Sequence, residues 1–551
     1  MSIVQETEAA RPKRARAPGS RSPNILMIVT DQEMSAGTLP EGMLEKLPGH
    51  LELMSLGVSV EGYHVHTTPC SPSRSTIFTG RHTQATGVYL NNDTPPSPPM
   101  NPLPTLGHML RAADYYTVYK GKWHLSGINA ERNWPSVPGR PTLLYPNTQN
   151  AMEPFGFSDY GFNGEEVGLT WGGYHSDRVV AGDAARLIMD FKDPGRSQNK
   201  PWFMVVGLVN PHDIMFYDAT GKQSLTRPAP DLLGPLRREP GDPLYAEDLG
   251  FDLPESFYKD DLASKPEAHA AIARYNDFFY GKMPLDDVAS WKRFINYYYN
   301  CLRDVDRNLQ QLIWSLREAG QLDNTIIVYT SDHGERAGAH GLRQKAGTMY
   351  REETNVPMII AHPDAAGGQT STRLMSAIDL APTLLGFAGK DDAWRQERFP
   401  ELPGVDVSGL AADPAARTER DERGHLFNYA VGYMWERLPP GQKPANGTLP
   451  YDLTKRRLHR GVHDGRYKFA RYFAPAQHHR PEDWDMLARY NDLELYDTQA
   501  DPGEIVNLAS DPAQQANILR LNGMVNRLVD LEVGVDDGRE YPGDAAAYRL
   551  S

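Results

Sequence analysis

The sequence predicts an α/β fold with a large, mostly parallel sheet flanked by helices, plus a smaller C-terminal α+β subdomain with an antiparallel sheet. Three apolar runs, 25–30, 202–208 and 325–330, have the length and continuous hydrophobicity of strands buried on both faces. After about residue 400 the segments become shorter and alternate between apolar and polar residues, which is typical of antiparallel strands.

Helical patterns lie between the predicted strands. The clearest apolar stripe has helical spacing and would pack on the sheet; it consists of Leu302, Val305, Leu309, Leu312, Ile313 and Leu316. In the C-terminal part, the pair Asp464-Gly465 within the segment 458–469 predicts a β-hairpin.

Composition excludes some classes of function. The 551 residues include 57 Lys and Arg against 71 Asp and Glu, a net charge of −14. An acidic chain repels phosphate backbones, so no nucleic-acid partner is predicted. The sequence has no run of about 18 apolar residues that could span a membrane, so no membrane partner is predicted either.

The first 23 residues are basic and rich in proline, without the apolar core of a secretory signal. They predict a disordered leader, although a short basic tail can also bind anionic surfaces or act as an address. Cys70 and Cys301 are the only cysteines. We therefore expect no structural disulfide, and we predict a cytoplasmic protein.

Polar pairs follow two of the predicted strands. Asp31-Gln32 comes directly after the first, and Asp332-His333 follows the run 325–330. Ligands of parallel sheets collect beyond the carboxyl ends of the strands. Two carboxylates, the Gln32 amide oxygen and His333 predict a mostly oxygen-based site for a divalent cation, where Ca²⁺ fits best and Mn²⁺ and Mg²⁺ remain open.

Cys70 begins the pentapeptide CSPSR, which ends at Arg74 and fits the pattern C-x-P-x-R. With 44 Pro and 57 Lys and Arg in 551 residues, a given cysteine has this context by chance in fewer than about 1% of cases. An isolated cysteine is usually a small buried residue. This pattern instead indicates a cysteine that is chemically converted.

The pattern resembles the recognition sequence of type I sulfatases, which belong to the alkaline phosphatase superfamily. In that family a maturation enzyme oxidises the cysteine to formylglycine, whose hydrate is the nucleophile. A thiolate would form a stable adduct with sulfur, whereas a geminal diol keeps a second hydroxyl that can expel the product. The resemblance implies formylglycine at Cys70, beside the metal, with Arg74 orienting it and neutralising charge around it.

Further motifs extend the resemblance. Lys122 and His124 lie in the element GKWHL, whose Lys and His contact the sulfate and the nucleophile in the family. His212, in Asn-Pro-His after the run 202–208, is similar to a second sulfate-binding histidine. Lys345 matches a family lysine only loosely, because Ala346 separates it from the glycine. The resemblance implies catalytic and substrate-binding roles for Lys122, His212 and Lys345, and a catalytic role for His124.

Two positions match the family pattern less closely. Asn91 matches a substrate-contacting residue of the choline sulfatase and phosphonate monoester hydrolase branches, although turn chemistry explains an asparagine there nearly as well. The family's first strand usually ends in two aspartates, and Gln32 replaces the second one, as in some relatives close to those branches. This replacement lowers the negative charge of the metal site.

The match extends from about residue 24 to about 510, because 494–497 and 501–508 resemble the closing signature of sulfatase C-terminal domains. We divide the chain into the disordered basic leader 1–23, a catalytic domain 24–400, and a C-terminal subdomain and tail 401–551. Insertions at about 128–175 and 213–290 are expected to form the leaving-group pocket. C-terminal arms in related branches often build oligomers, so a homo-oligomer is a further expectation.

The resemblance implies a sulfuric ester hydrolase, with a small arylsulfate as the first choice of substrate and choline, alkyl or sugar sulfates as alternatives. A phosphonate monoester or phosphodiester hydrolase of the same superfamily is the second hypothesis. Relatives of that kind carry hydroxyl side chains where this chain has Lys122 and His124, so the intact Lys-Trp-His favours sulfate. A third hypothesis is a binding protein in which Cys70 stays unconverted and the pocket only captures sulfated ligands.

Overall fold

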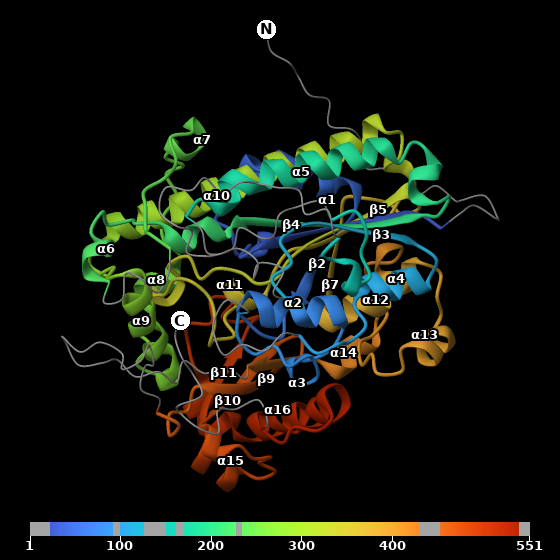
Figure 1. Ribbon diagram of the computed structural model, residues 1–551. Helices are drawn as coiled ribbons and strands as arrows, with labels where there is room; N and C mark the ends of the chain where they lie inside the picture. The colour runs from blue at the N-terminus through green and yellow to red at the C-terminus, as the bar shows by residue number, and fades with distance from the viewer. Residues whose placement is uncertain are drawn as a thin grey trace.

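A seven-stranded sheet forms the centre of the computed structural model, which describes residues 22–91, 100–125, 150–160, 170–227, 234–429 and 452–538. The strand order is β3-β4-β1-β5-β6-β2-β7 (Figure 1). The short strand β6 pairs antiparallel with both neighbours, and the other pairs are parallel. The strands are β1 (Asn24–Asp31), β2 (Val58–His64), β3 (Tyr116–Gly121), β4 (Trp202–Pro211), β5 (Thr325–Ser331), β6 (Met358–Ala361) and β7 (Gln369–Ser376). The predicted α/β fold and its three apolar strands are confirmed.

Helices cover both faces of this sheet (Figure 1). The first layer contains α1 (Pro48–Leu56), α5 (Gly172–Asp190) and α10 (Val288–Glu318), and the second contains α2 (Cys70–Thr79), α4 (Leu106–Ala112) and α12 (Leu380–Phe387). Because side chains alternate along a strand, Leu26 and Ile28 of β1 pack in the first layer while Met27 and Val29 pack in the second. Each such fully buried side chain contributes about 1.5–3 kcal/mol of hydrophobic stabilisation.

The predicted helical stripe lies in α10, whose apolar positions from Val305 to Leu316 are buried against the sheet, whereas Leu302 belongs to a different core. The first half of α10 packs instead against the segment 213–290, which contributes Ile214, Leu244 and Met283 to a separate core. Within that segment, residues 228–233 lie outside the described part of the chain, and its helices are α6 (Gln223–Thr226), α7 (Pro243–Ala246), α8 (Glu255–Lys259) and α9 (Glu267–Tyr280). Of the other predicted insertion, 128–149 and 161–169 also lie outside the described residues.

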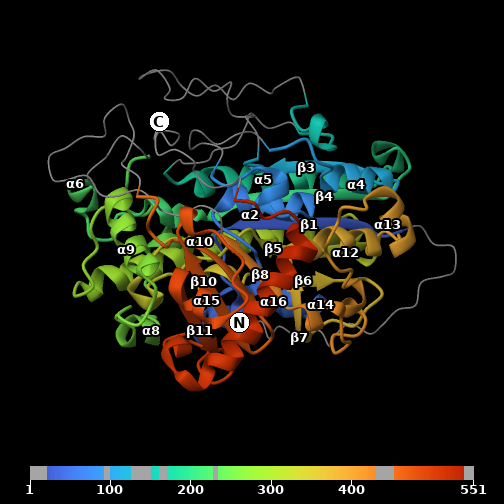
Figure 2. The same ribbon diagram turned by 90° about the horizontal axis from the view of Figure 1, so that it is seen from below.

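A second, antiparallel sheet of four strands has the order β11-β10-β9-β8 (Figure 2). Its strands are β8 (His425–Tyr429), β9 (Leu458–His463), β10 (Tyr467–Phe473) and β11 (Asp492–Asp497), and α16 (Gln515–Leu528) packs on it. The predicted hairpin joins β9 to β10: Gly465 has a φ of 96°, and the Tyr467 amide donates to Asp464 Oδ1 over 2.7 Å. The remaining helices are α3 (Thr83–Thr86), α11 (Arg351–Thr354), α13 (Asp392–Arg398), α14 (Glu419–Arg423) and α15 (Trp484–Tyr490).

The two cysteines are free and buried, as expected. Residues 1–21 of the predicted leader and 539–551 of the tail lie outside the described chain. Among the described residues, no helix combines the length and apolar character needed to cross a bilayer.

The strands β3, β4, β1 and β5 are consecutive neighbours and parallel, so their carboxyl ends meet at one edge of the sheet. At this edge β3 and β4 approach closely: the Lys122 amide donates to the Gly207 carbonyl over 2.9 Å. Gly121 has a φ of 82°, and a Cβ added there would lie 2.1 Å from the Gly207 carbonyl oxygen. Only glycine satisfies both conditions.

We therefore expect Gly121→Ala to lower the free energy of unfolding by about 2–4 kcal/mol, from left-handed strain plus overpacking. Gly320→Ala is the matched control, because Gly320 has a φ of 67° but no atom within 4 Å of an added Cβ. Urea unfolding should show a clearly smaller loss for the control. Equal losses for the two variants would contradict the steric explanation.

Candidate active site

Cys70 is the first residue of α2, and its side chain is buried at the shared edge of the strands. Its Sγ lies 3.2 Å from Nε2 of His333 and 3.7 Å from Oδ1 of Asp31. The start of a helix carries a partial positive charge, which favours an anionic group at that position. Residue 70 therefore sits where an oxyanion or thiolate would be stabilised.

Four of the predicted metal ligands form one cluster. Donor atoms of Asp31, Cys70, Asp332 and His333 all lie within 4.8 Å of one another, and all four residues are fully buried. His333 Nδ1 lies 2.9 Å from the Gly334 carbonyl, so Nδ1 carries the proton and Nε2 offers its lone pair to the cluster. The donor set of two carboxylates, one imidazole and residue 70 fits a divalent cation.

Two cations compensate the carboxylates. Arg74 Nε donates to Asp332 Oδ2 over 2.7 Å, and Lys122 Nζ donates to Asp31 Oδ2. Burial would raise the pKa of Asp31, but Lys122, His212, His333 and Lys345 together hold it well below its usual value.

Asp332 behaves in the opposite way: burial, and then the charge of Asp31, raise its pKa. Burial would lower the pKa of the Lys122 ammonium, but Asp31 raises it above its ordinary value. The two cations therefore match the two carboxylates one for one, and Asp31 is the more strongly ionised of the pair.

Gln32 connects this cluster to Lys345. The Gln32 backbone amide donates to Asp332 Oδ1 over 3.3 Å, and its side-chain nitrogen donates to Glu335 and to Gln344. Its amide oxygen, predicted to ligate the metal, accepts a hydrogen bond from Lys345 Nζ. Sequence reasoning did not assign a role to Glu335, whose carboxylate determines which way the Gln32 amide points.

The predicted sulfate-binding residues surround the cluster. His212 begins the 3₁₀ turn His212–Phe216 directly after β4, and Lys345 Nζ lies 3.7 Å from Met215 Sδ in the same turn. Burial, followed by the charge of Lys345, holds the pKa of His212 well below its usual value. His124 is buried in the segment after β3, where its carbonyl accepts a 2.6 Å hydrogen bond from Ser71.

Asn91 has a bonding partner at the same helix start. Its Oδ1 accepts a hydrogen bond from the Ser71 backbone amide over 3.1 Å. This amide belongs to the first turn of α2, where backbone N–H groups lack helical acceptors. The contact is a helix cap adjacent to residue 70, and the substrate contact inferred for Asn91 stays a prediction.

The family model described as Sulfatase matches residues 23–390 of the chain. The chain belongs to the sulfatase family. An uncharacterized sulfatase, YidJ of Escherichia coli, is 28% identical over 390 residues, 67% of this chain and 68% of that protein. The N-acetylglucosamine-6-O-sulfatase of Bacteroides thetaiotaomicron is 25% identical over 89% of this chain and 83% of its own length. An arylsulfatase of Chlamydomonas reinhardtii is 24% identical over 93% of this chain and 75% of its own length.

Solved structures share the sulfatase fold. A 2-O GAG sulfatase superposes with a TM-score of 0.63 at 20% identity, and the match covers 96% of each chain. The phosphonate monoester hydrolase of Silicibacter pomeroyi gives a TM-score of 0.60 at 21% identity, over 94% of this chain and 96% of that one.

Glu353 is a buried residue of the sulfatase site that sequence reasoning missed. Its Oε1 accepts from Thr68 Oγ1 over 2.8 Å and from the Ala346 amide, and its Oε2 accepts from Arg336 over 2.9 Å and from Thr348. One carboxylate thereby ties the segment that leads into α2 to the loop that carries the predicted lysine after β5. No local sequence pattern marks it, because its partners are distant or irregular.

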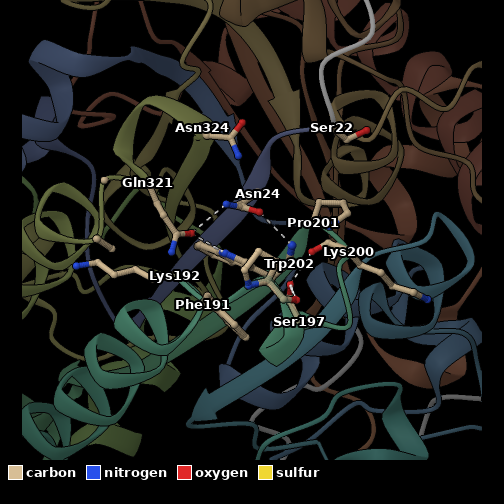
Figure 3. A pocket seen from close by; sticks show the side chains of 13 residues that line it. Ser22, Asn24, Phe191, Lys192, Ser197, Lys200, Pro201, Trp202, Gln321 and Asn324 are labelled. Carbon is tan, nitrogen blue, oxygen red and sulfur yellow. Dashed lines mark hydrogen bonds between the residues drawn. The ribbon is translucent and has the colours of Figure 1, made fainter.

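One pocket of the molecule does not belong to this site. A cavity of about 460 Å³ lies at the amino ends of β1 and β4, and none of the predicted site residues lines it (Figure 3). Gln321 Oε1 accepts from Asn24 Nδ2 over 3.2 Å and from Trp202 Nε1 over 2.9 Å. These polar groups satisfy one another, at the edge of the sheet opposite to Cys70.

A buried network of ionisable side chains lies next to the sulfatase site. His50 of α1 lies with Nδ1 2.7 Å from Asp306 of α10, and with Nε2 3.0 Å from Glu33 and 2.9 Å from the Tyr329 hydroxyl. Burial alone would lower the pKa of His50, but Glu33 and Asp306 raise it to about 9. The folded protein therefore binds the His50 proton more tightly than the unfolded chain, whose histidines titrate near pH 6.5.

The tighter proton binding by the folded protein makes its stability depend on pH in a defined direction. The stabilisation is complete below about pH 6.5 and is lost as the pH rises through about 9, and it amounts to about 3 kcal/mol. We expect the advantage of wild type over His50→Gln in urea unfolding to shrink by about this amount between pH 6 and pH 10. His175→Gln, at an exposed position of α5, is the control. Parallel pH profiles for wild type and His50→Gln would contradict the assignment.

Proposed function

We propose that the chain is a formylglycine-dependent sulfatase that hydrolyses sulfate monoesters, with arylsulfates as its substrates. The observation that carries the proposal is the placement of Cys70. The residue lies in the C-x-P-x-R pattern, starts α2, and directs its side chain into the cluster of Asp31, Asp332 and His333. Membership of the sulfatase family supports the same chemistry.

The reaction follows from the residues around position 70. One hydroxyl of the hydrated formylglycine gives its proton to Asp332 and attacks sulfur, the bond from sulfur to the alcohol oxygen breaks, and a sulfated hemiacetal forms. His212 or Lys345 assists the departing alcohol: Lys345 can donate a proton, and the neutral imidazole of His212 can donate a hydrogen bond to the leaving oxygen. His124 then removes the proton from the remaining hydroxyl, the bond to the sulfate oxygen breaks, and water rehydrates the aldehyde.

Arg74 and Lys122 orient residue 70 and offset negative charge throughout the cycle. Arg74 can do so because its guanidinium makes two fixed contacts. Its Nε donates to Asp332, and its Nη1 donates to the Lys122 carbonyl over 2.9 Å. These bonds fix both cations relative to α2. Electrostatic groups that need no rearrangement during the reaction contribute most to catalysis.

The divalent cation would be held by Asp31, Asp332, His333 and residue 70. The Gln32 amide oxygen, the other predicted ligand, accepts a hydrogen bond from Lys345. The bound cation would supply positive charge that favours the ionised hydrate and neutralises sulfate oxygens. The mostly oxygen-based donor set favours Ca²⁺, with Mn²⁺ and Mg²⁺ as alternatives.

A phosphonate monoester or phosphodiester hydrolase is the alternative activity, and the likeness to such an enzyme supports it at the level of the fold. The intact Lys122-Trp123-His124 favours sulfate. Relatives named for N-acetylglucosamine 6-O-sulfate keep sugar sulfates as an alternative to arylsulfates. Cytoplasmic residence, a maturation enzyme as partner and homo-oligomerisation remain proposals from sequence.

The choice between sulfate and phosphodiester is tested with converted enzyme and esters that share the 4-nitrophenol leaving group. We expect kcat/KM to be higher for 4-nitrophenyl sulfate than for bis(4-nitrophenyl) phosphate. Lys122→Ala should lower kcat/KM for the sulfate by about 10²–10³, the usual effect of removing one charge-stabilising donor.

Lys120→Ala is the matched control, because Lys120 lies two residues before Lys122, in β3, but pairs with Asp183 over 2.6 Å outside the cluster. It should keep the kcat/KM of wild type. Much faster cleavage of the phosphodiester would overturn the assignment to sulfate. Absence of both activities in converted enzyme would contradict the proposed hydrolase.

A further inference from the structure

Three potential metal ligands meet outside the candidate active site, at the junction between the large sheet and the C-terminal subdomain. His66 lies between β2 and α2, His82 precedes α3, and Glu532 lies in the π-helical turn Val529–Val533 that follows α16. One donor atom from each residue lies within 4.8 Å of the other two, and all three side chains are buried. Segments that are distant in sequence thus bring two imidazoles and a carboxylate together.

The donors have the orientation and spacing of a metal site. The Leu426 carbonyl lies 2.7 Å from His66 Nδ1, so Nδ1 carries the proton and Nε2 presents its lone pair. His82 Nε2 and Glu532 Oε2 are 3.3 Å apart. Two ligands bound at 2.0–2.1 Å to a tetrahedral ion are separated by about the same 3.3 Å.

Arg420 alone does not balance the two carboxylates that it contacts. It donates to both oxygens of Asp379, over 2.6 Å and 2.9 Å, and to Glu532 Oε1. Two buried carboxylates therefore share one guanidinium, and the second positive charge must come from His82 or from a bound cation. Unpaired buried charge is costly, and the surplus negative charge lies directly beside the two imidazoles.

Glu532 belongs to an unusual stretch of backbone. The π-helical turn that carries it is a rare conformation, which is frequently found at functional sites. The same residue borders a cavity of about 860 Å³, together with Arg81, Val533 and Gly534. Its side chain itself is fully buried.

We propose that His66, His82 and Glu532 bind a divalent transition metal of the Zn²⁺ class. Two imidazole nitrogens and one carboxylate oxygen are a donor set that such ions prefer to Ca²⁺ or Mg²⁺. Water would complete the coordination. The ion would tie the C-terminal subdomain to the segments on both sides of α2, and it shares no ligand with the cluster at Cys70.

The experiment uses the full chain, treated with a chelator, loaded with Zn²⁺ alone and freed of unbound ion. The number of zinc ions per chain is then measured by inductively coupled plasma mass spectrometry. Glu532→Gln is the decisive variant, because Arg420 keeps its pair with Asp379 and the fold is expected to survive. We expect Glu532→Gln and His82→Ala each to bind one zinc fewer than wild type.

Two further variants separate this site from others. Asp332→Asn, which alters the candidate active site, should keep the zinc that Glu532→Gln loses. His463→Ala is a matched control, because His463 is a buried histidine near His64 and outside the three-residue cluster. It should bind as much zinc as wild type.

A second readout does not depend on stoichiometry and uses Asp332→Asn as the background, so that zinc at the candidate active site does not contribute. Zn²⁺ should raise the thermal unfolding midpoint of Asp332→Asn but not that of the double variant Asp332→Asn/Glu532→Gln. Equal zinc binding by wild type and folded Glu532→Gln would overturn the proposal and would leave a hydrogen bond from His82 to Glu532 without a metal. An unfolding midpoint of Asp332→Asn that Zn²⁺ does not change would overturn it as well.

Discussion

Asp31 and Asp332 are two buried carboxylates at the ends of adjacent parallel strands, and the rest of the site is arranged around the need to balance them. Burying one ionised carboxylate is costly, and burying two close together is costlier. Arg74 and Lys122 contact them from α2 and from the end of β3. Their carboxylate oxygens, together with His333 and residue 70, form the donor set that would hold a divalent cation at this edge.

The C-terminal subdomain takes part in this arrangement. Lys468 of β10 donates to the Met349 carbonyl over 2.8 Å and pairs with Glu504, whose other oxygen accepts from the Arg351 amide over 2.9 Å. Glu504 belongs to the closing signature recognised in the sequence. Its contacts fasten the small sheet to the segment that follows Lys345, which explains physically why that signature accompanies the active-site motifs.

The central strands were predictable because continuous apolar runs of this length have few alternatives, and the residues following them necessarily share one edge of a parallel sheet. Cys70, Arg74 and Lys122 could be found because each lies in a short motif. Glu353, Glu335 and the His50 network could not be found in this way. Their roles depend on partners far away in sequence, which only the folded chain brings together.

The most direct test is the mass of the proteolytic peptide that contains residue 70, from protein expressed with a formylglycine-generating enzyme. We predict replacement of the cysteine sulfur by oxygen with loss of two hydrogens, in a sample that hydrolyses sulfate esters. An unmodified cysteine in protein that hydrolyses sulfate esters at full rate would contradict the proposed nucleophile.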